Sequence, residues 1–437
     1  MFVLLLACAE PPDDSAAQPQ PVPWSRERAR VQEETPDGRS LKRSIIHLHS
    51  PLSHDACDDH EMADEPCLAD LRAGLCDAAV DLAFVTDHPA SAAETPYEDL
   101  FWLQDGDEMV EGTASRMHCT EGETVWIPGI EDELMPVGLD RHASTDAAEN
   151  DRIYNASDEE AIAADLAAGA VVLQAHTEGQ GIEVLLQRQA WGQTGVEMFN
   201  LHAMVDPNKR EDDLGLDGMA YLTDAGPFIA ATSDAEPDLV FLAFYQEQTV
   251  SLERWDALNL VAPTLGTAGT DAHENSLPML MRDAERVDSY RRMMTWFANY
   301  LAVDGEGPAA AEAALRDRTG YVAFDLLGTP TGFYVAYGES AWSADSAEVG
   351  GTLSVTCPTL APDSPTDTTD PVITATVFRD GVPWETGCGE FTVDEPGVYR
   401  VRVDIVPAHL TSALGDQAEA LLHAYPWLYS QAFRIGL

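Results

Sequence analysis

Short hydrophobic runs that end in a histidine or an acidic residue recur between residues 44 and 273, and they constrain the fold more than any other feature. In the first run, Ile45 and Ile46 precede His47, Leu48 and His49. β-branched residues fit a pleated surface, so this run predicts a short buried strand. Residues two apart on a strand point to the same face. The two histidines are therefore expected to share one face near the end of that strand.

Six further runs follow the same pattern. The seven predicted strands cover residues 44–49, 80–85, 125–130, 171–175, 196–199, 227–231 and 265–270. Helical stretches separate most of them, for example the Ala-rich segment 158–168. Such alternation predicts an α/β fold with a parallel sheet and right-handed crossovers. Polar residues at the strand ends favour a closed β/α barrel, because barrel sites are built at that face. A nucleotide-binding α/β fold is disfavoured, since no glycine-rich phosphate loop precedes a helix.

The C-terminal part of the chain has a different pattern. Short strands with turn residues replace the helical stretches, at 351–355, 372–378 and 398–403. Arg379–Gly381 is typical of a hairpin turn. We therefore predict a barrel over residues 41–320 and a small β-sandwich over residues 321–437. Only His409 and His423, of twelve histidines, lie in the second region, so the chemistry is expected upstream.

The N-terminus looks like an export signal. Leu5–Cys8 resembles a bacterial lipobox, in which the cysteine is lipidated after cleavage, and a frayed terminus is the alternative. We interpret residues 1–8 as a lipoprotein-type signal remnant. Residues 9–40 are rich in Pro, Asp, Glu and Gln without a hydrophobic period, which predicts a disordered tether. The predicted location is the bacterial cell envelope, in the periplasm or at the outer membrane.

Cysteine usage agrees with export. Six cysteines remain besides Cys8, and an even number in an exported protein permits three disulfides. Cys357 and Cys388 lie apart from the others and are predicted to pair. The other four allow three pairings, and the one that keeps both loops local joins Cys57 to Cys67 and Cys76 to Cys119.

Charge limits the range of partners. The chain has 24 Lys and Arg against 76 Asp and Glu, a formal net charge of −52. Such a field repels nucleic acid and anionic membranes. We expect a small-molecule substrate, no nucleic acid, and membrane contact only through a lipid on Cys8.

The strand ends supply a set of metal-ligand residues, namely His47, His49, His54, Asp55, His88, Glu131, His176, Asp271 and His273. Imidazoles with a few carboxylates suit Zn, Mn or Fe. These residues are too many for one tetrahedral ion. We therefore predict two or three divalent ions, with Glu131 as a bridging carboxylate.

Five segments, in this order, resemble the PHP superfamily (polymerase and histidinol phosphatase) of metal-dependent phosphoesterases: His47–Ser50, Thr86–His88, Pro128–Glu131, Ala175–His176 and Gly269–His273. Phe378–Gly381 and Pro426–Ser430 look like the exported CehA/McbA branch, which joins this barrel to a β-domain. The resemblance implies a distorted, seven-stranded, TIM-like β/α barrel with a trinuclear metal site.

The resemblance also implies how the ligands are shared. One metal would be held by His47, His49, Glu131 and Asp271. Glu131 would bridge to a second metal, completed by His176 and His142, for which a surface loop histidine is the alternative. A third metal would be held by His88, His273 and either His54 or Asp55. Catalytic roles would fall to Glu131, Asp271 and His273.

Several neighbouring polar residues are expected outside this ligand set. His60, His118 and His202 lack a strand-end context and are not predicted to be ligands. Asp87, Glu197 and Asn200 are expected to orient ligand imidazoles.

Three functions remain open. The first is an exported metallohydrolase, most like a phosphoesterase, in which a metal-bound hydroxide attacks the phosphoester. The second uses the same site on a carbamate, ester or amide. The third is a degenerate barrel that binds a ligand without hydrolysis, which the cost of unused buried His and Asp disfavours.

Overall fold

The computed structural model describes residues 24–30, 32–230, 232–361, 364, 367 and 369–437. Its centre is a closed ring of seven strands, each hydrogen-bonded to the next and the last to the first. In ring order they are β1 (Ser40–Leu48), β2 (Leu82–Asp87), β5 (Glu123–Ile130), β6 (Leu134–Val137), β7 (Val171–Gln174), β8 (Gly195–Asn200) and β9 (Leu265–Ala272). All pairings are parallel except those of β6, which is antiparallel to both neighbours. The predicted α/β barrel is therefore present as a mixed barrel.

One predicted strand is wrong. Residues 227–229 lie at the end of helix α9 (Ala220–Ile229), and the seventh barrel strand is β6 instead. A short apolar run does not distinguish a strand from a buried helical segment. Here Tyr221, Ala225 and Phe228 are buried at helical spacing on one side of α9.

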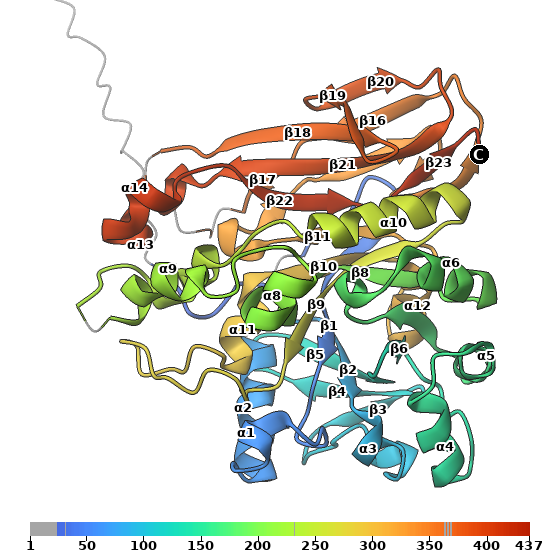
Figure 1. Cartoon of the computed structure of the whole chain (residues 1–437), viewed down its shortest axis with the longest axis vertical. Coiled ribbons are helices and arrows are strands. Elements are labelled where there is room, and N and C mark those ends of the chain that lie inside the picture. Colours follow the sequence, from blue (N-terminus) through green and yellow to red (C-terminus); the bar gives the residue numbers. More distant parts are fainter. Residues whose placement is uncertain (1–23, 31, 231, 362–363, 365–366, 368) are drawn as a thin grey trace, which may run out of the picture.

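Helices connect and cover the barrel strands (Figure 1). Helix α2 (Asp64–Asp77) buries Leu68, Leu71 and Leu75, as its spacing predicts. The predicted Ala-rich helix is α5 (Glu159–Ala167), which begins where the Asp158 side chain accepts a hydrogen bond from the Ala161 amide. The other helices are α1 (Ala56–Asp59), α3 (Pro89–Ala92), α4 (Ala147–Tyr154), α6 (Ile182–Trp191), α7 (His202–Val205), α8 (Pro207–Asp212), α10 (Thr249–Val261), α11 (Tyr290–Trp296), α12 (Pro308–Arg316), α13 (Thr411–Leu414) and α14 (Ala418–Leu421).

The sheet continues from the barrel into the C-terminal region. The first half of β1 pairs with β10 (Ala298–Val303), which leads to β11 (Gly320–Ala323), β22 (Tyr425–Ser430), β21 (Gly397–Val406), β18 (Val372–Arg379) and β19 (Val382–Thr386). β23 (Phe433–Ile435) pairs with β21 and with β15 (Ala344–Ala347). On the other side of the barrel, β4 (Ala114–His118) joins β3 (Glu108–Val110) to β5. The predicted boundary at residue 320 therefore falls inside β11, within a continuous sheet.

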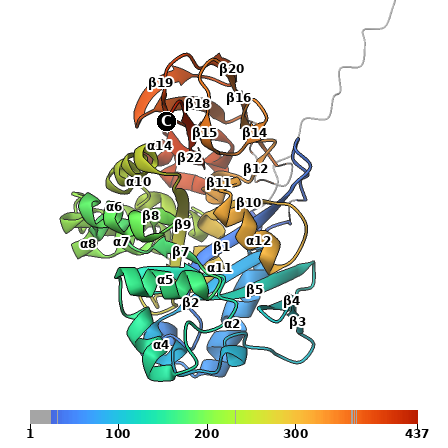
Figure 2. The same cartoon turned by 90° about the vertical axis from the view of Figure 1, so that its right-hand side faces the viewer.

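A second sheet completes the C-terminal region, in the order β14 (Ser340–Ala341), β13 (Tyr334–Tyr337), β16 (Thr352–Thr356) and β20 (Gly389–Thr392). β12 (Pro330–Thr331) and β17 (Thr359–Leu360) form a short separate pair. Figures 1 and 2 both place these strands at one end of the molecule, above the barrel. Helix α10 contacts β8 of the barrel and β21 of the C-terminal region.

Part of the predicted tether is packed on the barrel. The Trp24 indole donates to Asp238 at 3.0 Å, and Arg30 forms an ion pair with Asp81 at 2.7 Å. Arg28 is half-buried and donates to the Thr329 hydroxyl at 3.2 Å. The prediction of a disordered tether was wrong for this segment because it rested on the lack of a hydrophobic period. The segment is held instead by its indole and arginine side chains, which bind carboxylates and a hydroxyl of the folded chain. Residues 1–23, including the predicted lipidation site Cys8, lie outside the described residues.

The three predicted disulfides are confirmed: Cys57–Cys67, Cys76–Cys119 and Cys357–Cys388. Disulfides persist in oxidising environments, so they indicate an extracellular or otherwise oxidising compartment. Among the described residues, no helix has the length and apolar character needed to span a bilayer.

Candidate metal centre

Six barrel strands deliver histidines and carboxylates to one end of the barrel. β1 carries His47 and leads into His49, β2 leads into His88, and β5 leads into Glu131. His176 and His202 each follow a strand by two residues, and Asp271 and His273 stand at the end of β9. Their donor atoms form overlapping trios, within each of which all atoms lie within 4.8 Å of one another. The trios include His47–Glu131–His176, His47–His49–Asp271, His49–His88–His273, His54–Asp55–His88 and His176–His202–Asp271.

The separations within this cluster are those of ligands around cations. Two ligands bound at about 2.0–2.2 Å with a tetrahedral angle lie about 3.3–3.6 Å apart. Asp271 Oδ1 lies 3.3 Å from His47 Nε2 and 3.5 Å from His49 Nε2. Glu131 Oε1 and Asp271 Oδ2 each lie 3.5 Å from His176 Nε2. The same spacing recurs around Asp55, whose carboxylate oxygens lie 3.3 Å from His273 Nε2 and 3.5 Å from His88 Nε2.

Five buried donor atoms in the cluster lack a hydrogen bond of good geometry, and each lies beside an opposite charge instead: His47 Nε2, His49 Nε2, His273 Nε2, Asp55 Oδ1 and Glu131 Oε2. A buried polar atom left unsatisfied costs about 1–3 kcal/mol. Ion pairs within the cluster satisfy these atoms only in part, and bound cations would complete it. The imidazole and carboxylate donors fit divalent ions such as Zn, Mn or Fe.

Glu197 orients two of the ligand histidines. Its Oε1 lies 2.7 Å from His47 Nδ1, and its Oε2 accepts hydrogen bonds from the His176 amide at 2.9 Å and from Asn200 Nδ2 at 2.8 Å. An acceptor at Nδ1 leaves the Nε2 lone pair of His47 free for a metal. A Cβ at Gly269 would lie 1.8 Å from Glu197 Oε1, so this arrangement requires glycine there. Glu197 and Asn200 thus have the contacts that we expected of orienting residues.

Hydrogen bonds involving Asp87 and two serines fix the loop that follows β1. Asp87 accepts hydrogen bonds from both the amide and the hydroxyl of Ser50 at 2.7 Å. Burial raises the pKa of Asp87 to about 6, against the lowering effect of these hydrogen bonds. Ser53 Oγ lies 2.8 Å from His49 Nδ1 and accepts from the His88 amide at 3.0 Å. The loop after β1 is thereby attached to two ligand histidines.

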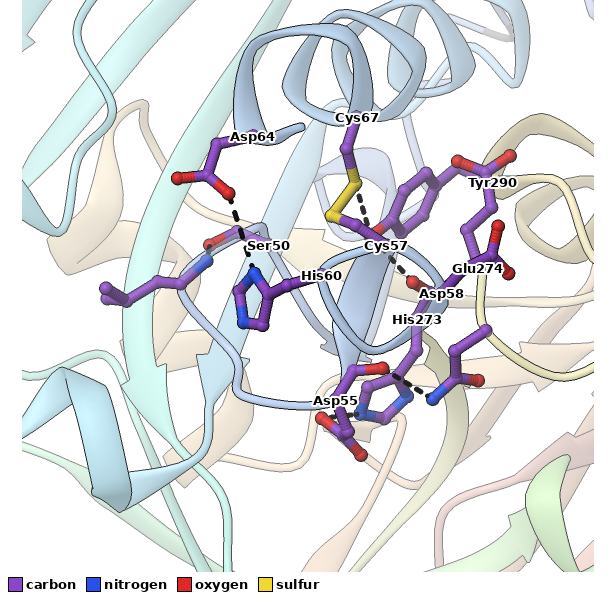
Figure 3. The surroundings of a disulfide bond; sticks show 12 residues. Ser50, Asp55, Cys57, Asp58, His60, Asp64, Cys67, His273, Glu274 and Tyr290 are labelled. Atoms are coloured by element: carbon purple, nitrogen blue, oxygen red, sulfur yellow. Dashed lines mark hydrogen bonds and ion pairs between the residues drawn. A yellow bond between two sulfur atoms is a disulfide. The ribbon is translucent and has the colours of Figure 1, made fainter. Parts of the chain in front are cut away.

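The loop that carries Asp55 is tied down by a disulfide. Figure 3 shows Asp55 beside His273, on a loop that the Cys57–Cys67 bond joins to helix α2. Residues 57–60 all have positive φ, between 52° and 61°, a conformation that non-glycine residues rarely adopt. The Cys57 amide donates to the His273 carbonyl at 3.0 Å, and Arg286 pairs with Asp58 at 2.8 Å. The disulfide and these contacts offset the unfavourable backbone.

Three candidate ligands are themselves in the left-handed region, with φ of 65° at His47, 49° at His176 and 48° at Asp271. The register of β1 shifts between Ile46 and Leu48, which re-aims His47 relative to a regular strand. Strained backbone of this kind collects at functional sites, where the surrounding structure enforces it.

Opposite charges stabilise the cation-free cluster. Burial lowers the pKa of His47, but Asp271 and Glu197 outweigh burial and raise it to about 10. Burial raises the pKa of Glu131, and contacts with His176 and His88 outweigh burial and lower it to about 2. Burial and neighbouring imidazoles lower the pKa of His49 well below its ordinary value. His49 is therefore neutral, whereas His47 must release a proton before it can bind a metal.

The structure does not bring His142 to this cluster. Its Nδ1 lies 3.1 Å from the Tyr154 hydroxyl and its Nε2 lies 2.8 Å from the Thr95 carbonyl. Both ring nitrogens are engaged, so we remove His142 from the ligand set.

His202, which the sequence interpretation excluded, takes its place. His202 Nδ1 lies 3.1 Å from Asp271 Oδ2, and the side chain is 44% exposed at the rim. The available signal was its position two residues after the predicted strand that ends at Asn200. The structure places both His54 and Asp55 near His88, so both stay in the set of candidate ligands.

Comparisons with known proteins identify no family. No family model and no curated protein matches the chain. A solved structure, PsfC from Pseudomonas syringae PB-5123, matches with 14% identity, 63% of this chain, 87% of that chain and a TM-score of 0.35. Membership of the PHP superfamily therefore stays a prediction.

Proposed function

We propose that this chain is an exported, metal-dependent hydrolase of small-molecule esters, with a PHP-type site for two or three divalent ions. The convergence of five buried donor atoms without a hydrogen bond of good geometry, at one end of a closed barrel, carries the proposal. In proteins, closely spaced divalent cations supply Lewis acidity and lower the pKa of a bound water. The substrate bond that we favour is a phosphoester, and the location that we propose is the cell envelope, with a lipid on Cys8.

Two carboxylates are placed to hold neighbouring cations together. Glu131 and Asp271 both form trios with His47 and His176, Asp271 also does so with His49 and His202, and both carboxylate side chains are almost fully buried. Two negative charges between adjacent cations offset their mutual repulsion. His273 and His88 lie beside Asp55, which makes Asp55 the carboxylate ligand of a third metal.

A carbamate, carboxylic ester or amide is the second candidate bond. The observation that favours it is the absence of lysine and arginine among the described residues lining the cavity beside the cluster. Phosphate groups in proteins are commonly held by arginine and lysine side chains. A ligand-binding barrel without turnover is the third candidate and predicts metal binding alone.

The test is turnover by the metal-reconstituted full chain on an aryl phosphodiester, a phosphomonoester and an aryl carbamate. We expect phosphodiester hydrolysis, and its loss by at least about a hundredfold in Glu131→Gln, because one removed electrostatic group already costs 10²–10³-fold. Glu123→Gln, at the exposed start of the same strand, is the matched control and should keep full activity. Hydrolysis of the carbamate alone would assign the second bond, and metal binding without any turnover would support the ligand-binding alternative.

A further inference from the structure

The cavity beside the metal centre has two chemically distinct halves. It has a volume of about 170 Å³, and one half is lined by proposed ligands, among them Asp55, His176 and His273. The other half is hydrocarbon, contributed by Leu201, Val205, Leu277, Val287, Met293 and Trp296. These residues come from three places: the end of β8 with α7, the segment after β9, and α11. An apolar wall thus borders the proposed reacting centre.

The polar groups on this wall are already engaged. The Trp296 indole N–H donates to the Asp238 carbonyl at 2.9 Å. Asp288 accepts hydrogen bonds from the amides of Ser276 and Leu277, both at 2.7 Å. Asn275 donates to the Asp55 carbonyl at 2.8 Å. A substrate group in this half therefore meets hydrocarbon and saturated polar atoms.

The charges that line the cavity also limit which substrate group can occupy it. None of the described lining residues is a lysine or arginine, whereas Asp55, Asp271 and Asp288 are acidic. The nearby Arg286 guanidinium is taken up by Asp58 and Asp288. An anionic group would find attraction only at bound cations, and a second anionic group in the apolar half would be repelled.

We propose that the substrate carries an aromatic or branched hydrocarbon group, which fills the apolar half while the ester bond lies at the metal centre. This inference rests on the proposed hydrolase function and names its substrate class. An engineered cavity of about 150 Å³ accepts benzene, so the two halves together, about 170 Å³, have room for one ring, from which the ester group would extend toward the metal centre. In the reaction the ester bond breaks, water supplies hydroxide to the ester's central atom, and the leaving alcohol takes the remaining proton.

The test separates the apolar half from turnover. Methylphosphonate and benzylphosphonate bear the same metal-binding group and differ by one ring. Their dissociation constants from metal-loaded full-length protein are measured by calorimetry. One methylene in an apolar pocket is already worth about 10-fold or more, so benzylphosphonate should bind at least about 30-fold tighter.

Two substitutions fill the apolar half from different segments, Val205→Trp from α7 and Leu277→Trp from the segment after β9. Each should reduce the preference to less than about threefold while metal content per chain stays at the wild-type value. Val261→Trp is the matched control, because Val261 also ends a helix but is 61% exposed, and it should keep the full preference.

The outcomes are distinct. Equal binding of the two phosphonates, or a preference that survives both tryptophan substitutions, overturns the apolar half as a substrate subsite. A benzyl preference together with hydrolysis of esters that bear a ring supports the inference. A benzyl preference without hydrolysis of any ester removes the proposed function and leaves an apolar ligand site beside metals. Failure of both phosphonates to bind overturns the inference together with the metal centre.

Discussion

At the scale of single residues, Glu197 joins ligands from two different strands. It faces the ring of His47 and the backbone of His176, and its side chain is fully buried. Glu197→Gln keeps the shape but replaces one acceptor oxygen by a donor and removes the charge. We expect metal affinity to fall by about 10–100-fold, the usual cost of losing such a partner. Chelator competition measures this change, and Glu253→Gln on the exposed face of α10 is the control. Wild-type affinity in Glu197→Gln would contradict the positioning role.

Asp165 provides a test of residue-scale electrostatics away from the site. It is 1% exposed in α5, its Oδ1 has no partner, and burial raises its pKa to about 8. In the unfolded chain its pKa is about 3.9, so the folded state holds the proton longer. Its contribution to stability is therefore present below about pH 4 and is lost as pH rises toward 8.

Asp165→Asn cannot ionise, so it should stabilise the fold by on the order of 3 kcal/mol at pH 8 and by little at pH 4. Denaturant unfolding at both pH values measures the difference. Asp224→Asn makes the same change at an exposed position of α9 and should have no pH-dependent effect. Equal effects of Asp165→Asn at both pH values would show that this carboxyl does not titrate as the burial requires.

At the scale of elements, strong local patterns were predictable and weak ones were not. The strands ending near His47, His88 and Glu131 are β-rich runs followed by polar residues, and the structure contains them. β6 consists of four residues, one of them proline, which argues against a strand in sequence interpretation. Its pairing is set by its neighbours in the closed ring, which a local pattern does not report.

The residues of the candidate site divide in the same way into those that a local sequence pattern predicts and those that it does not. Residues directly at predicted strand ends converge in the structure. His202 was missed because Leu201 separates it from the end of β8 and it begins helix α7, so its position two residues after the strand was not given weight. His142 was included only through the resemblance, and the contacts with Thr95 and Tyr154 that engage its ring depend on the tertiary fold.

The loop from β1 to α2 gives a prediction at the element scale. The Cys57–Cys67 disulfide holds a left-handed turn next to Asp55. Replacing both cysteines by serine should release this turn, weaken binding of the metal that we propose Asp55 holds by at least about tenfold, and destabilise the chain by about 2–4 kcal/mol.

The matched control replaces Cys357 and Cys388, which lie in the C-terminal region. It should lower stability without a change in metal affinity. The measurements are metal titration and thermal unfolding of both double variants. Unchanged metal affinity in a folded Cys57→Ser/Cys67→Ser protein would show that the disulfide does not support metal binding.

At the scale of the whole molecule, the barrel and the C-terminal strands form one structure. Gln431 donates to the Gly266 carbonyl at 2.8 Å and accepts from its amide at 2.9 Å, and Arg400 pairs with Asp256 of α10 at 2.6 Å. Phe324, Trp427 and Tyr300 belong to a single buried cluster. We expect the full chain to unfold in one transition, and a chain ending at residue 320 to lack cooperative unfolding. Circular dichroism during heating checks this, and a cooperative transition of the truncated chain would restore the predicted domain boundary.

The central claim is that the strand ends of this barrel bind divalent cations. The most direct measurement is the number of metal ions per chain, by elemental analysis after reconstitution with Zn or Mn and removal of free metal. We predict two or three ions per wild-type chain, at least one fewer in His202→Ala, and the wild-type number in His142→Ala. Fewer than one ion per wild-type chain, or an equal loss in the two variants, would contradict the account.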